Sequence, residues 1–295
     1  MAGAHTLCCM VSSTGTAKAR TLGAALKRAR EQADVGLREL ERRTAGAIKN
    51  STWSRVESGE RLPQPEQVIR VLDELDVTGA LRQEILAVMD AEDTGHSWLP
   101  VGVPEPRAHL AAMLEFERTT KRITQVAMTV VPGLLQTAEY ARAVIRAEAP
   151  AADVEPRVAV RVGRREILNR RNPVQMTALI GEAAITANVG GREAMDDQLR
   201  HLLTMAEKPN IDLRIVPGGI GYHPGMVKPL FSLFDFESAS PILHIEVGEA
   251  GLYLHEEADV EGYRDAARKV LDVALTPRMS VMKVTELLAG RMERT

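Results

Sequence analysis

Cysteine and long apolar runs are what this chain has least of. Its only two cysteines, Cys8 and Cys9, are adjacent, so they cannot build a disulfide framework and make a weak metal site. No apolar run approaches the roughly 20 residues that a membrane-spanning helix needs. The N-terminus has no charged segment before its short apolar patch, so it makes a poor signal peptide. We therefore expect a cytoplasmic protein without a membrane segment.

The length and the proline distribution predict two domains. With 295 residues, of which 45% are hydrophobic, the chain can bury more than one core and is not generally disordered. Residues 94–106 read TGHSWLPVGVPEP, and their prolines and glycines are typical of a linker. We predict a flexible tail over residues 1–17, a first domain over 18–93, this linker, and a second domain over 107–295.

Residues 37–63, LRELERRTAGAIKNSTWSRVESGERLP, have the pattern of two short helices around a tight turn. Leu37 and Leu40 lie one helical turn apart on the first helix, and Trp53 points inward from the second. Gly46 tolerates the positive φ that a tight turn needs. This is the layout of a helix-turn-helix, whose second helix enters the major groove of DNA. Further amphipathic patterns complete an all-α domain of five helices, at residues 21–32, 66–75 and 78–89.

This arrangement resembles the XRE family of transcription regulators, a phage-repressor-like class. The resemblance covers about residues 20–90 and rests on Leu37-Arg38-Glu39-Leu40, Ile48, Ser54-Arg55-Val56-Glu57-Ser58-Gly59 and Arg61-Leu62-Pro63. Trp53 departs from it, because the family usually has a smaller aliphatic residue there, and this predicts a slightly enlarged core. The resemblance implies sequence-specific DNA binding.

The family's DNA-contacting positions can be transferred to individual residues here. Asn50 and Ser51 match its base-reading positions, and Arg55 matches the reader one turn further on. Asparagine can pair bidentately with adenine and arginine with guanine, while nearby basic residues add sequence-independent affinity. For the basic residues the alternative is a solvated helix face, and for Ser54 it is a hydrogen bond to a backbone carbonyl. The resemblance implies this DNA-binding set: Arg38, Lys49, Asn50, Ser51, Thr52, Ser54, Arg55 and Arg61.

Charge divides unevenly along the chain. Residues 18–65 hold eleven basic and six acidic side chains, a net charge of +5, and the other residues carry −8, because the whole chain carries −3. This asymmetry suits a DNA-facing segment joined to one that faces elsewhere. One helix-turn-helix reads few base pairs, so we expect a homodimer on a pseudo-palindromic operator with half-sites about 34 Å apart. The apolar face of residues 81–89 and the second domain are candidate interfaces.

Helical and strand patterns are interspersed irregularly in the second domain, which predicts an α+β fold. We expect strands at residues 123–131, 174–180, 211–216, 230–236, 242–247 and 251–254. We expect helices at 107–120, from 136 or 137 onward, at 154–170, after Gly191 as far as Glu207, at 260–275 and at 280–291.

Several stretches of this domain resemble the C-terminal domain of the actinobacterial WhiJ-like regulators, across about residues 107–290. The most specific is Val131-Pro132-Gly133-Leu134-Leu135-Gln136-Thr137 with Glu139-Tyr140-Ala141-Arg142. The others include Arg161 with Arg164-Arg165, Glu182-Ala183-Ala184, Val189-Gly190-Gly191, Gln198-Leu199, Val216-Pro217 and Ile245-Glu246. The resemblance implies a sensor or interaction domain, and a small partner protein that is often encoded by a neighbouring gene.

Five residues of the second domain are candidates for partner or ligand binding. Arg161, Arg164 and Arg165 make a basic stripe in an acidic half, suited to a carboxylate-rich surface; the alternative is a solvated or internally paired helix face. His244 and Glu246 alternate along one strand and share a face that could line a pocket. The neighbouring histidines and glutamates fit no zinc motif, and a wet strand face or a hydrogen-bonded pair is the stronger interpretation. We predict no metal, cofactor or catalytic residue.

Together these patterns predict a homodimeric transcription regulator that binds double-stranded DNA in the nucleoid. Its second domain is expected to receive a signal from a small partner protein or a ligand, and the protein is favoured. Two alternatives stay open. One is an enzyme or small-molecule sensor fused to a helix-turn-helix, and the other is the antitoxin-like module of a toxin–antitoxin-type pair.

Overall fold

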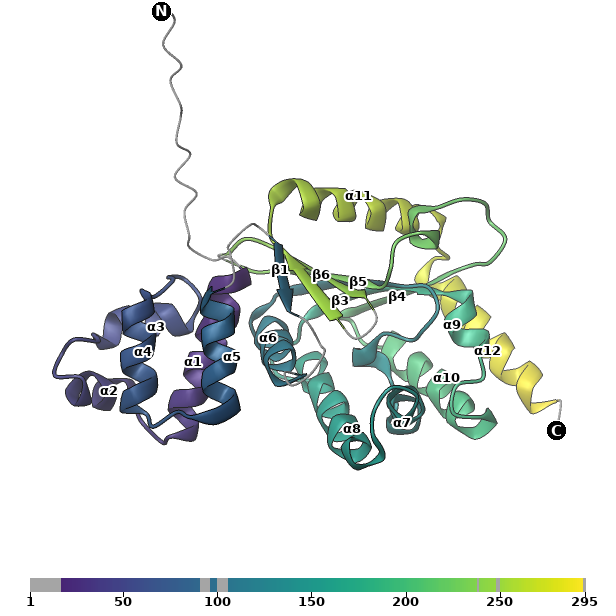
Figure 1. Cartoon of the computed structure of the whole chain (residues 1–295). Helices are drawn as coiled ribbons and strands as arrows, with labels where there is room; N and C mark the ends of the chain where they lie inside the picture. Colours follow the sequence, from purple (N-terminus) through teal and green to yellow (C-terminus); the bar gives the residue numbers. More distant parts are fainter. Residues whose placement is uncertain (1–16, 91–95, 100–105, 238, 248–249, 294–295) are drawn as a thin grey trace, which may run out of the picture. The chain divides into compact units, whose positions relative to one another are not determined.

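The computed structural model describes residues 17–90, 96–99, 106–237, 239–247 and 250–293. The chain forms two compact units, with the boundary between Thr94 and Gly95. The first is helical and the second combines a mixed sheet with helices (Figure 1), which confirms the predicted all-α and α+β classes. The predicted N-terminal tail lies outside the described residues, except for its last residue.

Five helices form the described part of the first unit, close to the predicted ranges. They are α1 (Ala17–Gln32), α2 (Leu37–Arg43), α3 (Asn50–Glu57), α4 (Pro65–Glu74) and α5 (Gly79–Asp90). Helices this short are not stable alone in water, so their apolar faces must be buried against one another. Each contributes a side chain that is at most 1% exposed: Leu26, Leu40, Trp53, Val71 and Ile85.

The helices α1 and α3 cross in very close contact at Gly23. A Cβ atom on Gly23 would lie 2.2 Å from the carbonyl oxygen of Val56, so no larger residue fits without displacement. Just beyond α3, Gly59 has a φ of +75°, and a Cβ there would lie 2.5 Å from Cγ of Arg20. Glycine at both positions lets α3 lie against α1 and then lets the chain turn away. The direction of the second helix of the pair is therefore fixed by backbone packing.

A seven-stranded sheet forms the centre of the second unit, in the order β1-β7-β6-β5-β2-β3-β4. The neighbours β2, β3 and β4 are parallel, whereas the remaining pairs are antiparallel. The strands are β1 (His96–Leu99), β2 (Arg122–Ala127), β3 (Gln175–Gly181), β4 (Ile211–Val216), β5 (Phe231–Asp235), β6 (Ile242–Val247) and β7 (Ala250–Leu254). The predicted strands correspond to β2 through β7.

The strand β1 lies within the residues that are predicted to be a linker. Residues 96–99 instead pair antiparallel with β7, with Trp98 opposite Leu252. Four residues between prolines and glycines are too few to show a strand alternation of their own. This strand therefore depends on its partner β7, which a local pattern does not reveal.

Helices cover both faces of the sheet (Figure 1). On one face, Val260, Ala267 and Val270 of α11 (Glu257–Val273) pack in one core with Leu243 and Ile245 of β6. Below the other face in this view lie α6 (Pro106–Thr119), α7 (Ala138–Arg146), α8 (Val154–Gly163) and α10 (Arg192–Ala206). The last helix, α12 (Pro277–Met292), packs against α10 and the edge strand β4.

Two helical segments of the second unit differ from the prediction. The single helix expected over residues 154–170 ends at Gly163, and residues 164–168 continue as a 3-10 helix. Glycine has a low helix propensity, and the tighter winding changes the direction of the side chains that follow it. The short helix α9 (Glu182–Thr186) follows β3 directly and was not predicted.

Candidate nucleic-acid interface

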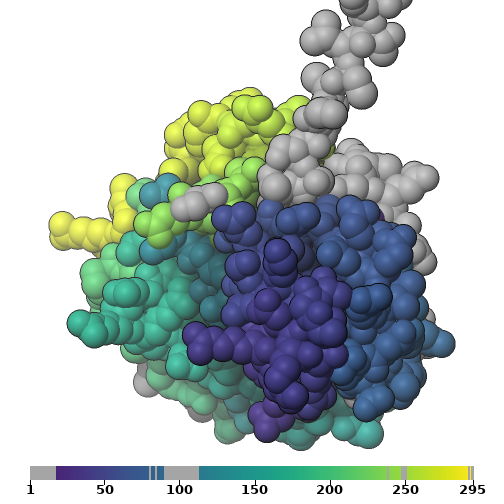
Figure 2. Space-filling model, turned by 90° about the vertical axis from the view of Figure 1, so that its left-hand side faces the viewer, coloured from purple at the N-terminus to yellow at the C-terminus, as the bar shows by residue number. Residues whose placement is uncertain are grey.

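The helix α3 turns one face to solvent and the other to the core of the first unit. All eight predicted DNA-binding residues reach the surface: Arg38, Lys49, Ser51, Ser54, Arg55 and Arg61 are exposed, and Asn50 and Thr52 are partly exposed. The opposite face of α3 contributes buried Trp53 and Val56. In Figure 2 the side of this unit that carries α2 and α3 faces the viewer. A helix with one exposed polar face suits insertion into the major groove.

The turn between α2 and α3 is held by side-chain hydrogen bonds as well as by glycine. The hydroxyl of Thr44 accepts a hydrogen bond from the amide of Ile48 at 3.2 Å. Gly46 has a φ of +78°, as the tight turn requires. The turn is therefore specified at both ends.

Glu41 caps the exposed helix α3, a role that the sequence did not reveal. Its carboxylate accepts a hydrogen bond from the backbone amide of Asn50 at 3.2 Å, whereas the N-cap residue Lys49 provides no side-chain cap. A carboxylate at a helix N-terminus also interacts favourably with the helix dipole. Glu41 lies nine residues before Asn50, beyond the span of any local capping pattern.

A buried ion pair joins the end of α3 to α1. The Nε and Nη2 atoms of Arg30 each donate to the carboxylate of Glu57 at 2.7 Å, and Nη1 donates to the carbonyl of Val35 at 2.8 Å. The side chains of Arg30 and Glu57 are only 11% and 5% exposed. Hydrogen bonding to Glu57 raises the pKa of Arg30, against the opposing effect of burial. A bidentate contact of this kind fixes orientation as well as distance.

The predicted phosphate-contacting cations are available for a ligand. In the part of the chain that the structure describes, no carboxylate lies within ion-pair distance of Arg38, Lys49 or Arg61. Arg55 has one weak contact, with Glu60 at 4.0 Å.

The neighbouring cations Arg42 and Arg43 are already paired, because both donate to Glu39. These hydrogen bonds lower the pKa of Glu39 to about 2. Within the described residues, Arg38, Lys49 and Arg61 are therefore without an ion-pair partner, whereas the neighbouring Arg42 and Arg43 are paired with Glu39.

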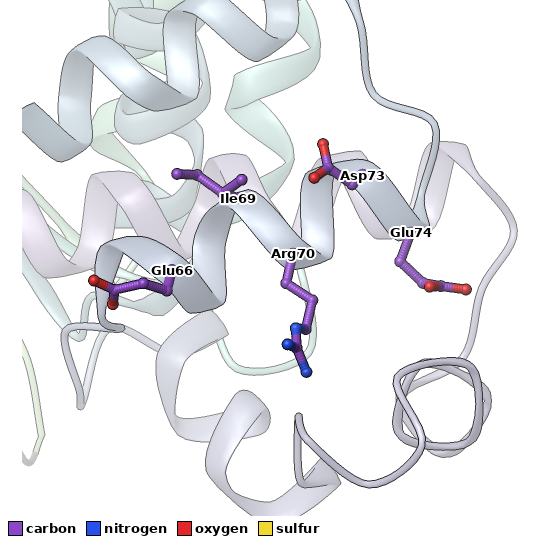
Figure 3. A pocket seen from close by; sticks show the side chains of 5 residues that line it. All are labelled: Glu66, Ile69, Arg70, Asp73 and Glu74. Atoms are coloured by element: carbon purple, nitrogen blue, oxygen red, sulfur yellow. The ribbon is translucent and has the colours of Figure 1, made fainter.

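The surface of α4 has a different character. A hollow of about 460 Å³ lies over this helix (Figure 3). It is lined by Glu66, Ile69, Arg70, Asp73 and Glu74. Three carboxylates outnumber one guanidinium, so the hollow repels phosphate, and we exclude it from the DNA interface.

The three arginines of the second unit do not form one exposed stripe. Arg164 donates from Nη2 and Nε to the carboxylate of Glu117 at 2.5 and 2.9 Å, and both side chains are largely buried. Arg165 lies against His201, with 3.3 Å between Nη1 of the guanidinium and Nε2 of the histidine ring. Arg161 is half-buried. For Arg164 the structure shows the internally paired alternative rather than a surface for a partner.

His244 and Glu246 lie on one face of β6, but in different surroundings. The ring of His244 is fully buried and stacks on Tyr253 of β7, with 4.6 Å between the ring centres. Glu246, two residues on, reaches the surface. The wet strand face considered for His244 is therefore not observed.

His244 and Glu246 belong to a polar cluster. Its other members are Glu117, Arg161, Arg164 and Tyr253. Restricted solvation raises the pKa of Glu246, against the charges of Arg161 and Arg164. Burial also lowers the pKa of Arg161 and raises that of Tyr253. Arg161 and Glu246 influence each other's pKa through their charges. Within the described residues, neither has an oppositely charged group within the 4 Å of an ion pair.

The stretch over residues 131–137 forms a turn next to this cluster, held by two buried glutamines. Gln136 donates to the carbonyl of Val131 at 2.8 Å and accepts from Arg161 at 3.3 Å. Gln198 of α10 accepts from the amide of Thr137 at 2.7 Å. These contacts explain the glutamines in two of the stretches that resemble the WhiJ-like regulators, residues 131–137 and 198–199.

The fold and the exposed helix α3 define a two-domain helix-turn-helix protein. A family model described as "Helix-turn-helix domain" matches residues 21–85, and this domain marks the chain as a DNA-binding regulator. A second model, "Domain of unknown function (DUF5753)", matches residues 110–286. Because this match spans more than half of the chain, the chain belongs to the DUF5753 family. No curated protein matches it.

Two further properties of the described residues concern membranes and metals. None of these helices is both long and apolar enough to cross a membrane. Within the same residues, no group of three or more histidine, cysteine, aspartate and glutamate side chains could hold a metal ion.

Proposed function

We propose that this chain is a sequence-specific, homodimeric transcription regulator of the XRE type that acts on DNA in the cytoplasm. One observation carries the proposal: α3 presents Asn50, Ser51 and Arg55 to solvent while Arg30 and Glu57 lock its far end to α1. Base recognition needs side chains that are held in a fixed direction by a rigid support. The buried ion pair and the close crossing at Gly23 supply that support.

In this proposal Asn50 and Arg55 read base edges in the major groove. Asparagine matches the donor and acceptor of adenine, and arginine matches the two acceptors of guanine. Ser51, Thr52 and Ser54 lie between them on the helix and contribute shorter contacts. Phosphates are bound by Arg38, Lys49 and Arg61, whose cations have no competing carboxylate in the described residues.

The test is a selection of preferred sites from random duplex DNA with the full chain, followed by binding measurements on variants. We expect a pseudo-palindrome, and we expect Asn50→Ala or Arg55→Ala to cost about 1–3 kcal/mol at one base position. Lys49→Ala should weaken all sequences alike, and Arg70→Ala, in the acidic hollow of α4, should change nothing. An unaltered base preference in Arg55→Ala removes that assignment. A wild-type chain without any sequence preference contradicts the proposal.

We also propose that the second domain receives the signal that controls DNA binding, as the WhiJ-like resemblance implies. Its 186 residues from Pro106 to Arg291 far exceed what dimerisation alone requires. We favour a small protein from a neighbouring gene as the signal. The polar cluster supports a second candidate, a small charged ligand held by Arg161 and Glu246.

Two measurements separate these candidates. Calorimetric titration of the full chain with the neighbouring small protein should show saturable binding. A thermal-shift screen of charged metabolites should show no saturable shift; a shift of several degrees that disappears in Arg161→Gln and Glu246→Gln, but not in Arg157→Gln, would favour the ligand instead. The antitoxin-like alternative predicts that the small protein is toxic without this chain. We propose no enzymatic activity, and turnover of a substrate that is lost in Glu246→Gln would contradict this.

A further inference from the structure

The loop between β4 and β5, residues 217–230, carries an exposed apolar surface. Among its side chains, Tyr222 is 75% exposed, Val227 69%, Met226 63% and Ile220 41%. Monomeric proteins rarely expose large apolar side chains in such a concentrated group, and groups of this kind mark interaction sites. We name these four residues the apolar loop patch.

The loop is anchored, so the exposure does not come from a loose chain. At its base, the amide of Gly218 donates to the carboxylate of Glu182 at 2.8 Å. In its middle, His223 is 7% exposed, and Gly225 approaches the sulfur of Met128 so closely that a Cβ would lie 3.0 Å from it. At its end, Lys228 lies over the ring of Tyr263, 3.8 Å from the centre.

Two glycines shape the backbone of this loop. Gly219 and Gly221 have φ values of +73° and +89°, which side chains rarely adopt. They flank Ile220, so the backbone around this exposed side chain has a conformation that glycine adopts without strain. An anchored loop that presents apolar side chains to water is costly without a partner.

The apolar loop patch continues onto the start of α12. Glu182, which holds the base of the loop, also pairs with Lys283 of α12 at 2.6 Å. Met279 lies one turn before Lys283 on the same face of α12, and Met282 is one turn after Met279; their side chains are 51% and 52% exposed. Figure 1 shows the loop and the start of α12 at the same end of the sheet. Methionine and tyrosine are enriched in protein interfaces.

A second copy of this chain is the partner that fits best. The other sequence-based candidate interface, residues 81–89, is largely used internally, because Ile85 and Val88 of α5 are buried in the first unit's own core. Within residues 217–230, Lys228 is the only lysine, arginine, aspartate or glutamate. A nearly uncharged surface can face its own copy across a two-fold axis without like-charge repulsion.

We propose that the apolar loop patch, together with Met279 and Met282, is the homodimer interface. This inference rests on the proposed function only in its need for two DNA-binding units. In a two-fold dimer the same loop meets its own copy, so both copies contribute each apolar side chain to the interface. The proposed interface uses no residue of α3, so the residues proposed to read DNA are not part of it.

The experiment measures the mass of the full chain by light scattering at micromolar concentration. The wild type should have twice the 32.3 kDa chain mass. The double variant Tyr222→Ser, Val227→Ser should dissociate, with a dimer dissociation constant raised at least about 100-fold. The matched control Ile69→Ser, Val160→Ser removes two exposed apolar side chains elsewhere and should remain dimeric. Unchanged far-ultraviolet circular dichroism and a cooperative melting transition establish that both variants are folded.

A second measurement tests the same interface by cross-linking, without the serine variants. In a chain with Cys8→Ser and Cys9→Ser, Val227→Cys should give a covalent dimer with a short bis-maleimide, whereas Ile69→Cys should not. A wild-type monomer overturns the inference, as does a dimer that persists in the Tyr222, Val227 double variant. Dimerisation only after a different protein is added also overturns it. If the wild type dimerises through the patch but lacks sequence preference on DNA, only the proposed function fails.

Discussion

The guanidinium of Arg30 on α1 forms two hydrogen bonds of 2.7 Å with the carboxylate of Glu57 at the end of α3. Both groups are buried, so removing one leaves the other as an uncompensated charge. We expect Arg30→Ala to reduce the unfolding free energy of the first unit by about 3–5 kcal/mol.

Urea unfolding followed by circular dichroism measures this loss. The control is Arg43→Ala, which breaks an exposed contact with Glu39 and should cost less than about 1 kcal/mol. Replacing both partners, as Arg30→Met with Glu57→Leu, should recover part of the loss because no buried charge remains. Equal destabilisation by Arg30→Ala and Arg43→Ala would show that the buried pair has no special role.

Gly23 provides a second test of how α3 is held. Alanine there would place a Cβ 2.2 Å from the carbonyl oxygen of Val56, so the two helices must separate. We expect Gly23→Ala to destabilise the first unit by about 1–3 kcal/mol and to weaken DNA binding.

Gly262, within α11, has no atom within 4 Å of its Cβ position. Gly262→Ala should therefore be neutral or stabilise the second unit by up to about 1 kcal/mol, because alanine favours helix. Thermal unfolding of both variants measures the two effects. A Gly23→Ala variant as stable as the wild type would mean that the close crossing at Val56 does not constrain the chain.

The sequence predicts the first unit more completely than the second, for physical reasons. Each of its helices carries its own apolar periodicity and a stop signal such as Gly59, so local rules place α1 to α5. The contacts that orient α3 were not predictable. The Arg30–Glu57 pair joins residues 27 positions apart, and Glu41 reaches Asn50 across the turn. No local spacing indicates either contact.

The second unit shows the same limit on a larger scale. Strands β4 and β6 were predicted with their observed bounds, because their apolar runs end at clear turn signals. Strand β1 could not be predicted, because its only support is the ladder with β7. The residues Arg161, Arg164 and Arg165 follow one another in sequence, yet Arg164 turns to buried Glu117, which is 47 positions away. Periodicity finds elements, whereas the partner of a charge depends on the assembled fold.

His201 of α10 makes the stability of the second unit depend on pH. Burial, and then the charge of Arg165, lowers the pKa of His201 below its usual value. A histidine with a lowered folded pKa binds protons more readily when the chain unfolds. Its contribution to stability is therefore present above the unfolded pKa of about 6.5 and is lost as pH falls through the window below it.

Melting temperatures of the wild type and of His201→Gln, measured between about pH 7.5 and about pH 5, test this dependence. The wild type should lose more stability on acidification than the variant does. Arg165→Gln, which removes the neighbouring charge, should fall between them. The same pH dependence in the wild type and in His201→Gln would contradict a role for this ring.

The cations Arg38, Lys49 and Arg61 of the first unit should determine how strongly salt weakens DNA binding. Each cation that neutralises a phosphate releases a counterion, so its removal lowers the slope of log affinity against log salt by about 0.9. We expect this change for Lys49→Ala, Arg38→Ala and Arg61→Ala, with base preference unaltered. Arg42→Ala should have a smaller effect, because Glu39 already neutralises that guanidinium.

Fluorescence anisotropy with a labelled operator at several salt concentrations measures these slopes, and the full chain serves as the protein. Arg70→Ala is the matched negative control, because Arg70 lies among the carboxylates of the α4 hollow (Figure 3). If Arg70→Ala lowers the slope as much as Lys49→Ala, the DNA lies over α4 and the assignment of the interface to α3 is wrong. If none of the four α2–α3 variants changes the slope, phosphate binding by this face is excluded. The pairing of Arg42 with Glu39 predicts one pattern. The slope should decrease equally in Lys49→Ala and Arg61→Ala, and it should decrease less in Arg42→Ala.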